Sequence, residues 1–330
     1  MKANMSEVHP ELQAGINKIP QFTFARWNLW LLRGLLNLLP APKLPESLTI
    51  EDVFVPVADS QTKIRLRVYR PKATSSMTPV LLWMHGGGYI IGKPEMDDGR
   101  CIQFVQELGI VVVSVDYRLA PKYPFPTPLE DTYTALKWVY AQAKQLGIDP
   151  ARMAIGGESA GAGLAAALAQ LALDRNEIKL IFQLLVYPML DDKTVIRTDL
   201  ANKVHINWTL NSNRFGWESY LGNKPGTSDL PAYAVPSRRS NLSGLPPAWI
   251  GVGTLDLFHD EDVAYAQKLK DDGVECELVI IPGGFHGFDT DVSPQVVQDF
   301  RKSQIAALKR YLTWGVNHGT VQLGGIPDPF

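Results

Sequence analysis

One short stretch constrains the fold of this 330-residue chain more than any other. Residues 153–164 read Met-Ala-Ile-Gly-Gly-Glu-Ser-Ala-Gly-Ala-Gly-Leu, so an apolar run passes through Gly157-x-Ser159-x-Gly161 into an alanine-rich run. A serine at the crest of a strand-to-helix turn needs strained backbone, and glycines two residues before and after it let neighbouring chain pass without a clash. The turn would aim the hydroxyl at a helix N-terminus, where free N–H groups favour negative charge. Alone, the pattern would also suit a glycine-rich turn that packs a helix closely on a strand.

The remainder of the chain alternates predicted strands with predicted helices. Continuous apolar runs are typical of inner parallel strands covered on both faces, and they occupy residues 80–84, 110–115, 181–187 and 248–252. Residues 64–69 alternate apolar and polar side chains, as a strand near a sheet edge does, and residues 275–281 are the last predicted strand. Helices are expected at residues 127–146, with Thr127 as N-cap and Gly147 as the stop, and at residues 160–173, 260–272 and 295–311. This alternation predicts an α/β fold with a mostly parallel, doubly wound sheet.

Composition narrows the class of protein. The chain is 45% hydrophobic and 20% charged, which suits one large α/β domain with an extra lobe. Its net charge of −2 gives no electrostatic reason to expect a nucleic acid partner. Cys101 and Cys276 are far apart, which excludes a disulfide framework and a cysteine-rich metal site and suits a reducing compartment. Residues 1–20 contain no signal-peptide core, so we expect a cytoplasmic protein.

Two regions stand outside the alternation. Residues 1–48 resemble a separate helical lobe, and residues 190–235 are a polar, tryptophan-bearing interruption of the kind that often forms a functional lid. We expect these two regions to form a helical cap over a catalytic domain of residues 49–189 and 236–330.

The apolar segment of residues 22–39 requires a separate interpretation. It contains Arg26 and Arg33 and ends at Pro40, so it is too short and too polar to span a membrane, and no stable insertion is expected. One hypothesis is a helix that lies flat on a membrane surface. The preferred hypothesis is that its large apolar side chains cover an apolar cleft in the body of the protein, and these side chains are Trp27, Trp30, Leu31 and Leu35.

Polar side chains follow several predicted strands at the point where each strand ends. In such a sheet, ligands bind at the carboxyl ends of the strands. Ser159, Asp256 and His286 all fall there, in the chain order typical of this sheet type. A histidine base can take the serine proton, and a carboxylate can fix the histidine tautomer. Asp260 and Asp262 compete with Asp256 for the carboxylate role, but only Asp256 follows its strand directly.

The glycine run after the strand of residues 80–84 supplies a fourth element. His85-Gly86-Gly87-Gly88 could be a flexible turn, but consecutive glycines also allow backbone N–H groups to approach a tetrahedral oxyanion closely. The predicted donors are the N–H groups of Gly87, Gly88 and Ala160, with Gly86 shaping the turn.

These motifs together resemble one family. The chain is similar to the hormone-sensitive-lipase-like branch of the α/β-hydrolases, also called bacterial esterase family IV. The matching pieces are His85-Gly-Gly-Gly88, Asp116-Tyr-Arg-Leu-Ala-Pro121, Tyr123-Pro-Phe-Pro126, Gly157-Glu-Ser-Ala-Gly161 and His286-Gly-Phe288. The resemblance implies an α/β-hydrolase fold with an eight-stranded sheet and a cap, a Ser159–Asp256–His286 triad, and no metal or organic cofactor. Two positions differ from the common family pattern, because Glu158 replaces an aspartate and Leu257 replaces a proline after Asp256.

The function predicted from these residues is that of a serine carboxylesterase. Its substrates would be small-molecule esters with short- to medium-chain acyl groups, cleaved through an acyl-serine intermediate. The alternatives are a catalytically silent small-molecule binder on the same fold, an amidase or a true lipase. An exposed last strand at residues 275–281 would also allow two copies to pair as a homodimer.

Overall fold

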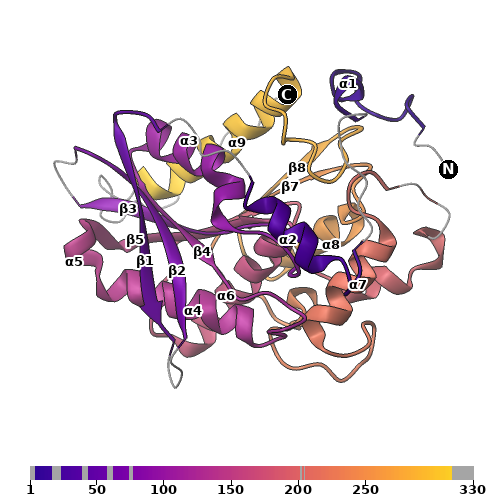
Figure 1. Ribbon diagram of the computed structural model, residues 1–330, viewed down its shortest axis with the longest axis horizontal. Coiled ribbons are helices and arrows are strands. Elements are labelled where there is room, and N and C mark those ends of the chain that lie inside the picture. The colour runs from indigo at the N-terminus through magenta and orange to yellow at the C-terminus, as the bar shows by residue number, and fades with distance from the viewer. Residues whose placement is uncertain are drawn as a thin grey trace.

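A single twisted sheet of eight strands crosses the molecule (Figure 1). The computed structural model describes residues 4–16, 24–38, 44–57, 62–73, 77–200, 203 and 205–313. The strand order is β1-β2-β4-β3-β5-β6-β7-β8, in which β1 pairs antiparallel with β2 and β2 antiparallel with β4, while all later pairs are parallel. The strands are β1 Leu48–Pro56, β2 Lys63–Pro71, β3 Thr78–Met84, β4 Val111–Asp116, β5 Ile148–Glu158, β6 Phe182–Val186, β7 Ala248–Gly253 and β8 Cys276–Ile281. The predicted mostly parallel α/β sheet is confirmed.

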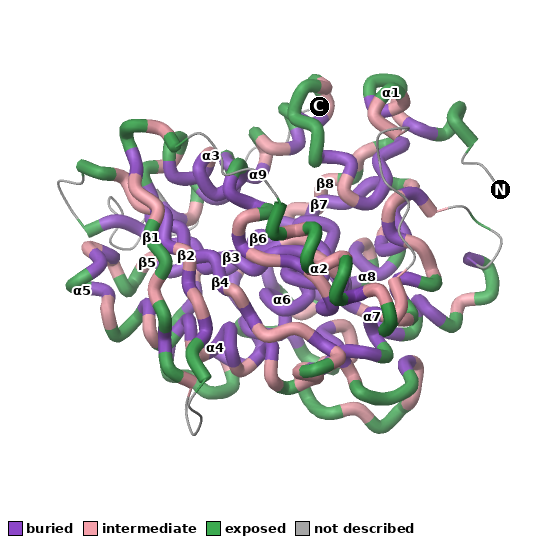
Figure 2. The backbone as a smooth tube through the Cα atoms, in the orientation of Figure 1, coloured by how far each residue is buried: buried purple, intermediate pink, exposed green. Residues whose placement is uncertain are grey.

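Helices cover both faces of this sheet. The helices α3 (Asp98–Leu108) and α9 (Gln295–Thr313) pack on one face, whereas α4 (Thr127–Ala141), α6 (Ala160–Arg175) and α8 (His259–Asp271) pack on the other. Two buried hydrophobic clusters result, one on each side of the sheet. The buried residues appear as a purple layer between the two sets of helices (Figure 2).

The helix predicted at residues 127–146 differs in detail from the structure. Thr127 is its first helical residue rather than the N-cap, because Pro126 occupies the cap position and makes no side-chain bond. The helix breaks at Gln142, and the short α5 (Ala143–Leu146) follows. Gly147 ends α5 with a left-handed φ of 67°, as predicted.

The two regions assigned to a cap are folded as short helices. The N-terminal region contains η1 (Pro10–Leu12), α1 (Gln13–Ile16) and α2 (Leu29–Leu36). The internal region contains η3 (Asp192–Ile196), η4 (Thr198–Leu200) and α7 (Leu210–Leu221), and η5 (Pro236–Arg238) follows it. Within the described residues, no helix is both long enough and apolar enough to cross a membrane.

The prediction that four apolar side chains of the N-terminal region cover a cleft is wrong. These side chains are largely exposed, at 76% for Trp27, 73% for Trp30, 47% for Leu31 and 46% for Leu35. Instead, α2 is attached through its other face, where Leu29 is buried and Arg33 donates hydrogen bonds to the carbonyl oxygens of Ile90 and Ala120. Because α2 carries leucine on both its inward and its outward face, its sequence could not show which face lies inward.

Candidate active site

Ser159 sits at the junction of β5 and α6 in a strained backbone conformation. Its φ of 53° and ψ of −122° fall outside the regions that L-residues ordinarily adopt. The flanking glycines make this turn sterically possible. A Cβ added to Gly157 would lie 2.6 Å from the carbonyl oxygen of Met84, and one added to Gly161 would lie 2.2 Å from the same atom. The turn therefore lies directly against the end of β3, and the sequence expectation for these glycines holds.

The structure brings His286 and Asp256 to this serine. The Oγ atom of Ser159 lies 2.9 Å from Nε2 of His286, and Nδ1 of His286 lies 2.9 Å from Oδ2 of Asp256. All three residues are buried, with exposures of 5%, 6% and 6% for Ser159, His286 and Asp256. The three side chains thus form one continuous hydrogen-bonded chain across the ends of β5, β7 and β8.

Asp256 is held firmly although the turn after it lacks a proline. Its Oδ1 atom accepts a hydrogen bond from the Phe258 amide, and the His259 amide donates to its carbonyl oxygen. The competing carboxylates are placed elsewhere. Asp260 is more than half exposed and pairs with Arg197, and Asp262 is buried with no hydrogen-bond partner among the described residues. Among these carboxylates, only Asp256 contacts His286.

The glycine loop after β3 lies beside the serine turn. Gly87 and Gly88 have φ values of 117° and 60°, which side chains would disfavour. A Cβ on Gly88 would fall 2.1 Å from the indole of Trp208. In the described part of the chain, the backbone N–H groups of Gly87, Gly88 and Ala160 donate no hydrogen bond, so they are available to an anion.

His85 contacts the glycine loop through its ring and contacts Tyr117 through both its ring and its backbone carbonyl. Its ring stacks on Tyr117 at a centroid distance of 4.3 Å, and its Nδ1 lies 2.8 Å from the carbonyl oxygen of Gly86. The Tyr117 hydroxyl donates to the carbonyl oxygen of His85. Burial lowers the pKa of His85, which favours the neutral ring, and the contact with the Gly86 carbonyl oxygen selects the tautomer with hydrogen on Nδ1. His85 and the Asp116–Pro121 segment therefore shape the glycine loop and do not touch Ser159.

Similarity to known proteins agrees with this geometry. The chain matches a family model described as an alpha/beta hydrolase fold over residues 81–290, more than half of its length. The carboxylesterase NlhH of Mycobacterium tuberculosis is 36% identical over 317 residues, which cover 93% of this chain and 97% of that protein.

This chain belongs to the hormone-sensitive-lipase-like branch of the α/β-hydrolases. The ethyl acetate hydrolase of Pseudomonas putida is 34% identical over 76% of this chain and 79% of its own. A solved structure titled bacterial heroin esterase has a TM-score of 0.86 at 35% identity and covers 94% of this chain and 99% of that chain. With relatives of this kind, the α/β-hydrolase described here is a carboxylic ester hydrolase.

A buried charged network connects the serine turn of this hydrolase to its histidine loop. Arg100 of α3 donates to Glu158, which precedes Ser159, at 3.1 Å and to Asp289 at 2.8 Å. The Tyr187 hydroxyl also donates to Asp289, at 2.7 Å. Burial is the largest single effect and acts to raise the pKa of Asp289, but Arg100, Arg301 and the Tyr187 hydroxyl together outweigh it and hold that pKa below its usual range. Burial likewise opposes the charge on Arg100, and Asp289 and Glu158 together raise its pKa.

Several contacts around the site could not be predicted from the sequence. Asn207 donates from its side chain to the carbonyl oxygen of His286 at 3.0 Å, and Trp208 lies beside the His286 ring with centroids 6.3 Å apart. Both residues lie in the polar region of residues 190–235, where the sequence shows no periodicity typical of a helix or strand. Arg100 and Asp289 are ordinary helix and loop charges in the sequence, so no local signal marks them.

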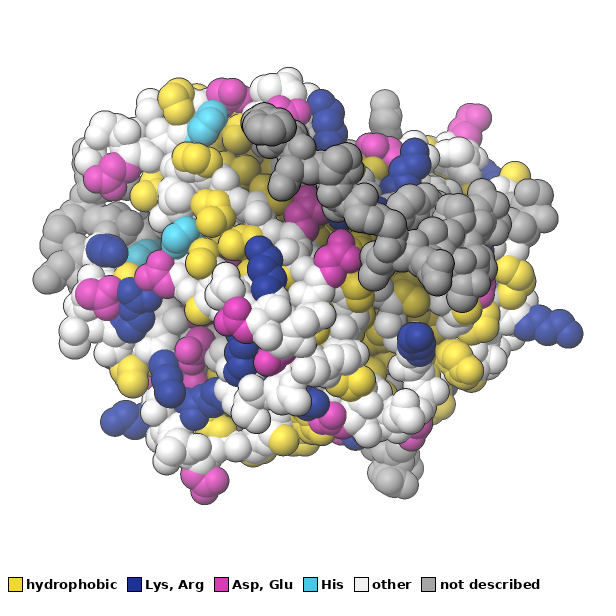
Figure 3. Space-filling model, turned by 180° about the vertical axis from the view of Figure 1, so that it is seen from behind, with side chains coloured by type: hydrophobic (Ala, Val, Ile, Leu, Met, Phe, Trp, Pro, Cys, Tyr) yellow, Lys and Arg dark blue, Asp and Glu magenta, His cyan; other side chains and the backbone are white. Residues whose placement is uncertain are grey.

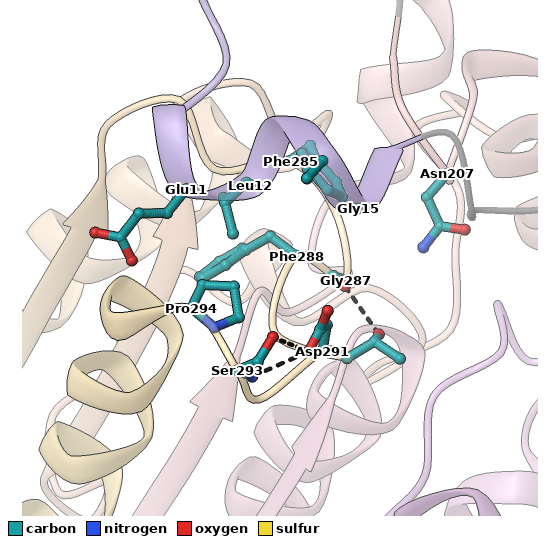
Figure 4. A pocket seen from close by; sticks show the side chains of 12 residues that line it. Glu11, Leu12, Gly15, Asn207, Phe285, Gly287, Phe288, Asp291, Ser293 and Pro294 are labelled. Atoms are coloured by element: carbon teal, nitrogen blue, oxygen red, sulfur yellow. Dashed lines mark hydrogen bonds between the residues drawn. The ribbon is translucent and has the colours of Figure 1, made fainter.

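A separate cavity of about 420 Å³ opens between the N-terminal region and the histidine loop (Figure 4). Leu12, Phe285 and Phe288 form its apolar wall, and Asn207 stands at its edge. None of Ser159, Asp256 and His286 lines this cavity. It is therefore not the space in which Ser159 would meet an ester. Among the described residues, no three His, Cys, Asp or Glu side chains gather in a way that could hold a metal ion.

Proposed function

We propose that this hydrolase cleaves small carboxylic esters through a covalent intermediate on Ser159. One observation carries the proposal: the chain from Asp256 through His286 to Ser159 ends beside three unused backbone N–H groups. A serine hydroxyl becomes a competent nucleophile when an adjacent base takes its proton, and the 2.9 Å contact to His286 supplies that base. A silent binder on the same fold would not need this complete arrangement.

The proposed reaction has two halves. His286 Nε2 accepts the Ser159 proton as Oγ attacks the ester carbonyl carbon, while Asp256 holds the tautomer with hydrogen on Nδ1 and stabilises the imidazolium. The N–H groups of Gly87, Gly88 and Ala160 bind the oxyanion, and one such donor contributes about 3–4 kcal/mol to the transition state. The C–O bond then breaks, and the leaving alcohol takes the proton from His286. Water repeats the sequence on the acyl-enzyme and releases the acid.

We infer a preference for short- to medium-chain acyl groups from the aromatic residues beside the glycine loop. Trp208 fills the space next to Gly88, and Phe24 lies 5.5 Å from Trp208 between ring centroids. These rings provide an apolar wall of limited depth next to the reacting groups. The name of the relative called ethyl acetate hydrolase agrees with a short acyl group. In this proposal the regions of residues 1–48 and 190–235 form the cap, and the remaining residues form the catalytic domain.

The proposal is tested by hydrolysis of p-nitrophenyl esters from acetate to palmitate, with wild type beside Ser159→Ala. Activity on the shorter esters should fall at least a thousandfold in the variant, because the proposed nucleophile is lost and His286 has no hydroxyl proton to accept. Ser303→Ala in α9 is a matched control that should keep full activity, because within the described residues its hydroxyl donates to the carbonyl oxygen of Phe300 and to no group of the site.

Two results would contradict the proposal. Substantial turnover by a folded Ser159→Ala variant would mean that another residue is the nucleophile. A folded wild type that binds but does not hydrolyse any ester would favour the silent binder, and faster cleavage of p-nitroanilides than of the matched esters would favour an amidase.

A further inference from the structure

The outer face of α2 carries a continuous apolar stripe. Positions spaced three and four residues apart share one face of a helix, and on this face they are all apolar. The side chains on α2 are Trp30 at 73% exposed, Leu31 at 47% and Leu35 at 46%, and Trp27 and Leu38, each 76% exposed, extend the row in the turns that flank the helix. We call these five residues the α2 stripe. In Figures 1 and 2 the helix lies on the face of the molecule turned toward the viewer, with its exposed side outward.

The stripe cannot turn inward, because the opposite face of α2 is already in use. Arg33 donates two hydrogen bonds to the carbonyl oxygen of Ile90 and one to that of Ala120, at 2.7–2.9 Å. Leu29 is 4% exposed. These contacts fix the rotation of the helix about its axis. The exposed tryptophans and leucines are therefore a stable property of the folded molecule and not a loosely packed part of its core.

The composition of the sequence that contains the stripe indicates the kind of surface it would meet. Residues 12–45 contain four basic side chains and no acidic one, although the chain as a whole carries −2. Arg33 is engaged inward, and Arg26 is exposed next to Trp27. On the opposite face of the molecule, Lys and Arg are interspersed with Asp and Glu (Figure 3). Tryptophan beside leucine and basic residues is the composition of helices that lie in the boundary layer of an anionic bilayer.

A second copy of the chain fits the α2 stripe less well as a partner than a lipid surface does. Stable protein interfaces use about 20–30 residues on each side, whereas the stripe has five residues on one short helix and its two flanking turns. A lipid surface has no such size requirement and attracts basic residues.

We propose that the α2 stripe docks this protein reversibly on an anionic lipid surface, with the axis of α2 parallel to that surface. This inference goes beyond the proposed function and does not depend on it. The docked helix is linked to the site at two points, because Arg33 binds the carbonyl oxygen of Ile90 just after the glycine loop and Phe24 contacts Trp208. A bound molecule would thus hold its glycine loop close to esters dissolved in the lipid.

The test is flotation of the full chain with vesicles, without any substrate. Wild type should float with vesicles of equal phosphatidylglycerol and phosphatidylcholine, less with pure phosphatidylcholine, and less again at high salt because screening weakens charge attraction. Trp27→Gln combined with Trp30→Gln should lower the bound fraction about tenfold. Arg26→Gln should weaken binding to the anionic vesicles only. Phe54→Gln is the matched control, since Phe54 is 59% exposed on β1, and it should bind like wild type.

The outcomes separate this proposal from its rivals. A blue shift of tryptophan emission on adding anionic vesicles supports docking. Wild type that floats with neither vesicle would overturn the proposal, and so would a double variant that floats as well as wild type. A concentration-dependent dimer that the double variant abolishes, without vesicle binding, would assign the stripe to a second copy. Because the flotation test contains no ester, a negative result would not affect the interpretation of ester hydrolysis by wild type and Ser159→Ala.

Discussion

Steric limits at single glycines decide whether the turn that carries Ser159 can form. At Gly161 the space for a Cβ is occupied by two backbone carbonyl oxygens, those of Met84 and His85, at 2.2 and 2.3 Å. Backbone atoms in the middle of a sheet cannot move aside as a flexible side chain can. The approach of β3 to the serine turn therefore depends on the absence of a side chain at this position.

Gly161→Ala should destabilise the protein by about 1–3 kcal/mol or more and should lower activity sharply, because the turn must shift away from β3. Gly99→Ala in α3 is the matched control: nothing lies within 4 Å of its Cβ, and alanine should stabilise that helix by up to about 1 kcal/mol. Urea unfolding monitored by circular dichroism measures the change in stability of each of the two variants. Equal effects of the two substitutions would show that the Gly161 contact does not matter.

Asp262 presents an electrostatic problem at the scale of one residue. Its carboxyl group is buried, neither oxygen has a hydrogen-bond partner among the described residues, and Glu261 and Asp256 lie nearby. Burial, with these neighbouring carboxylates, raises the pKa of Asp262 well above its usual value. A carboxyl group with a raised pKa in the folded state lowers stability progressively as the pH rises above its unfolded pKa of about 4.

Asp262→Asn should therefore gain stability relative to wild type as the pH rises from about 4 to 7, because asparagine has no proton to lose. The slope of this difference is at most about 1.4 kcal/mol per pH unit. Urea midpoints of both proteins at several pH values give the comparison. A difference that is constant with pH would mean that Asp262 does not titrate differently on folding.

Elements that are distant in sequence are joined around the site by the Arg100 network. Arg100 comes from α3, Glu158 from the end of β5 and Asp289 from the loop after β8. Arg100 and Asp289 are 5% and 1% exposed at their side chains. Removing one member of a buried charge group leaves the others uncompensated, which costs about 3–5 kcal/mol.

Arg100→Met should lower stability by about that amount, and kcat should fall because the serine turn and the histidine loop lose their common partner. Arg175→Met is a suitable comparison, because its pair with Glu130 is partly exposed and contributes at most about 1 kcal/mol. Thermal melting and steady-state kinetics are the measurements. A destabilisation no larger than that of Arg175→Met would show that the network is not important for stability.

At the scale of the whole molecule, the N-terminal region contacts the body mainly near the site. Val8 and Leu12 are buried beside the histidine loop, the His9 amide donates to the carbonyl oxygen of Gly283, and Arg33 binds the segment after the glycine loop. Both of the proposed catalytic loops therefore have one face covered by residues from the start of the chain.

Deletion of residues 1–40 should lower the melting temperature and alter the ratio of activities on short and longer acyl esters. The first effect follows from exposure of the buried surface under Val8 and Leu12, and the second from loss of the Phe24–Trp208 contact. A truncated protein that melts and discriminates like the full chain would refute the cap assignment. Pairing of two copies through β8, which ends the sheet order, stays a prediction that light scattering can test.

The sequence by itself determined most of the order of strands and helices, although it did not predict β1 or α3, and it determined which polar residues follow the strand ends. Apolar runs, glycine spacing and turn residues are local signals, and they correctly predicted the serine turn, the glycine loop and the parallel sheet. They also selected Ser159, Asp256 and His286, because in a parallel sheet the position of a residue just after a strand fixes the edge on which it lies.

Only the tertiary structure decided which groups meet and which faces stay exposed. The contact of Asn207 with His286, the Arg100 network and the outward direction of Trp27 and Trp30 depend on packing between segments far apart in the chain. An apolar helix with leucine on two opposite faces satisfies the same periodicity whichever face is buried. A buried arginine likewise looks like any surface arginine until its carboxylate partners are brought to it by the fold.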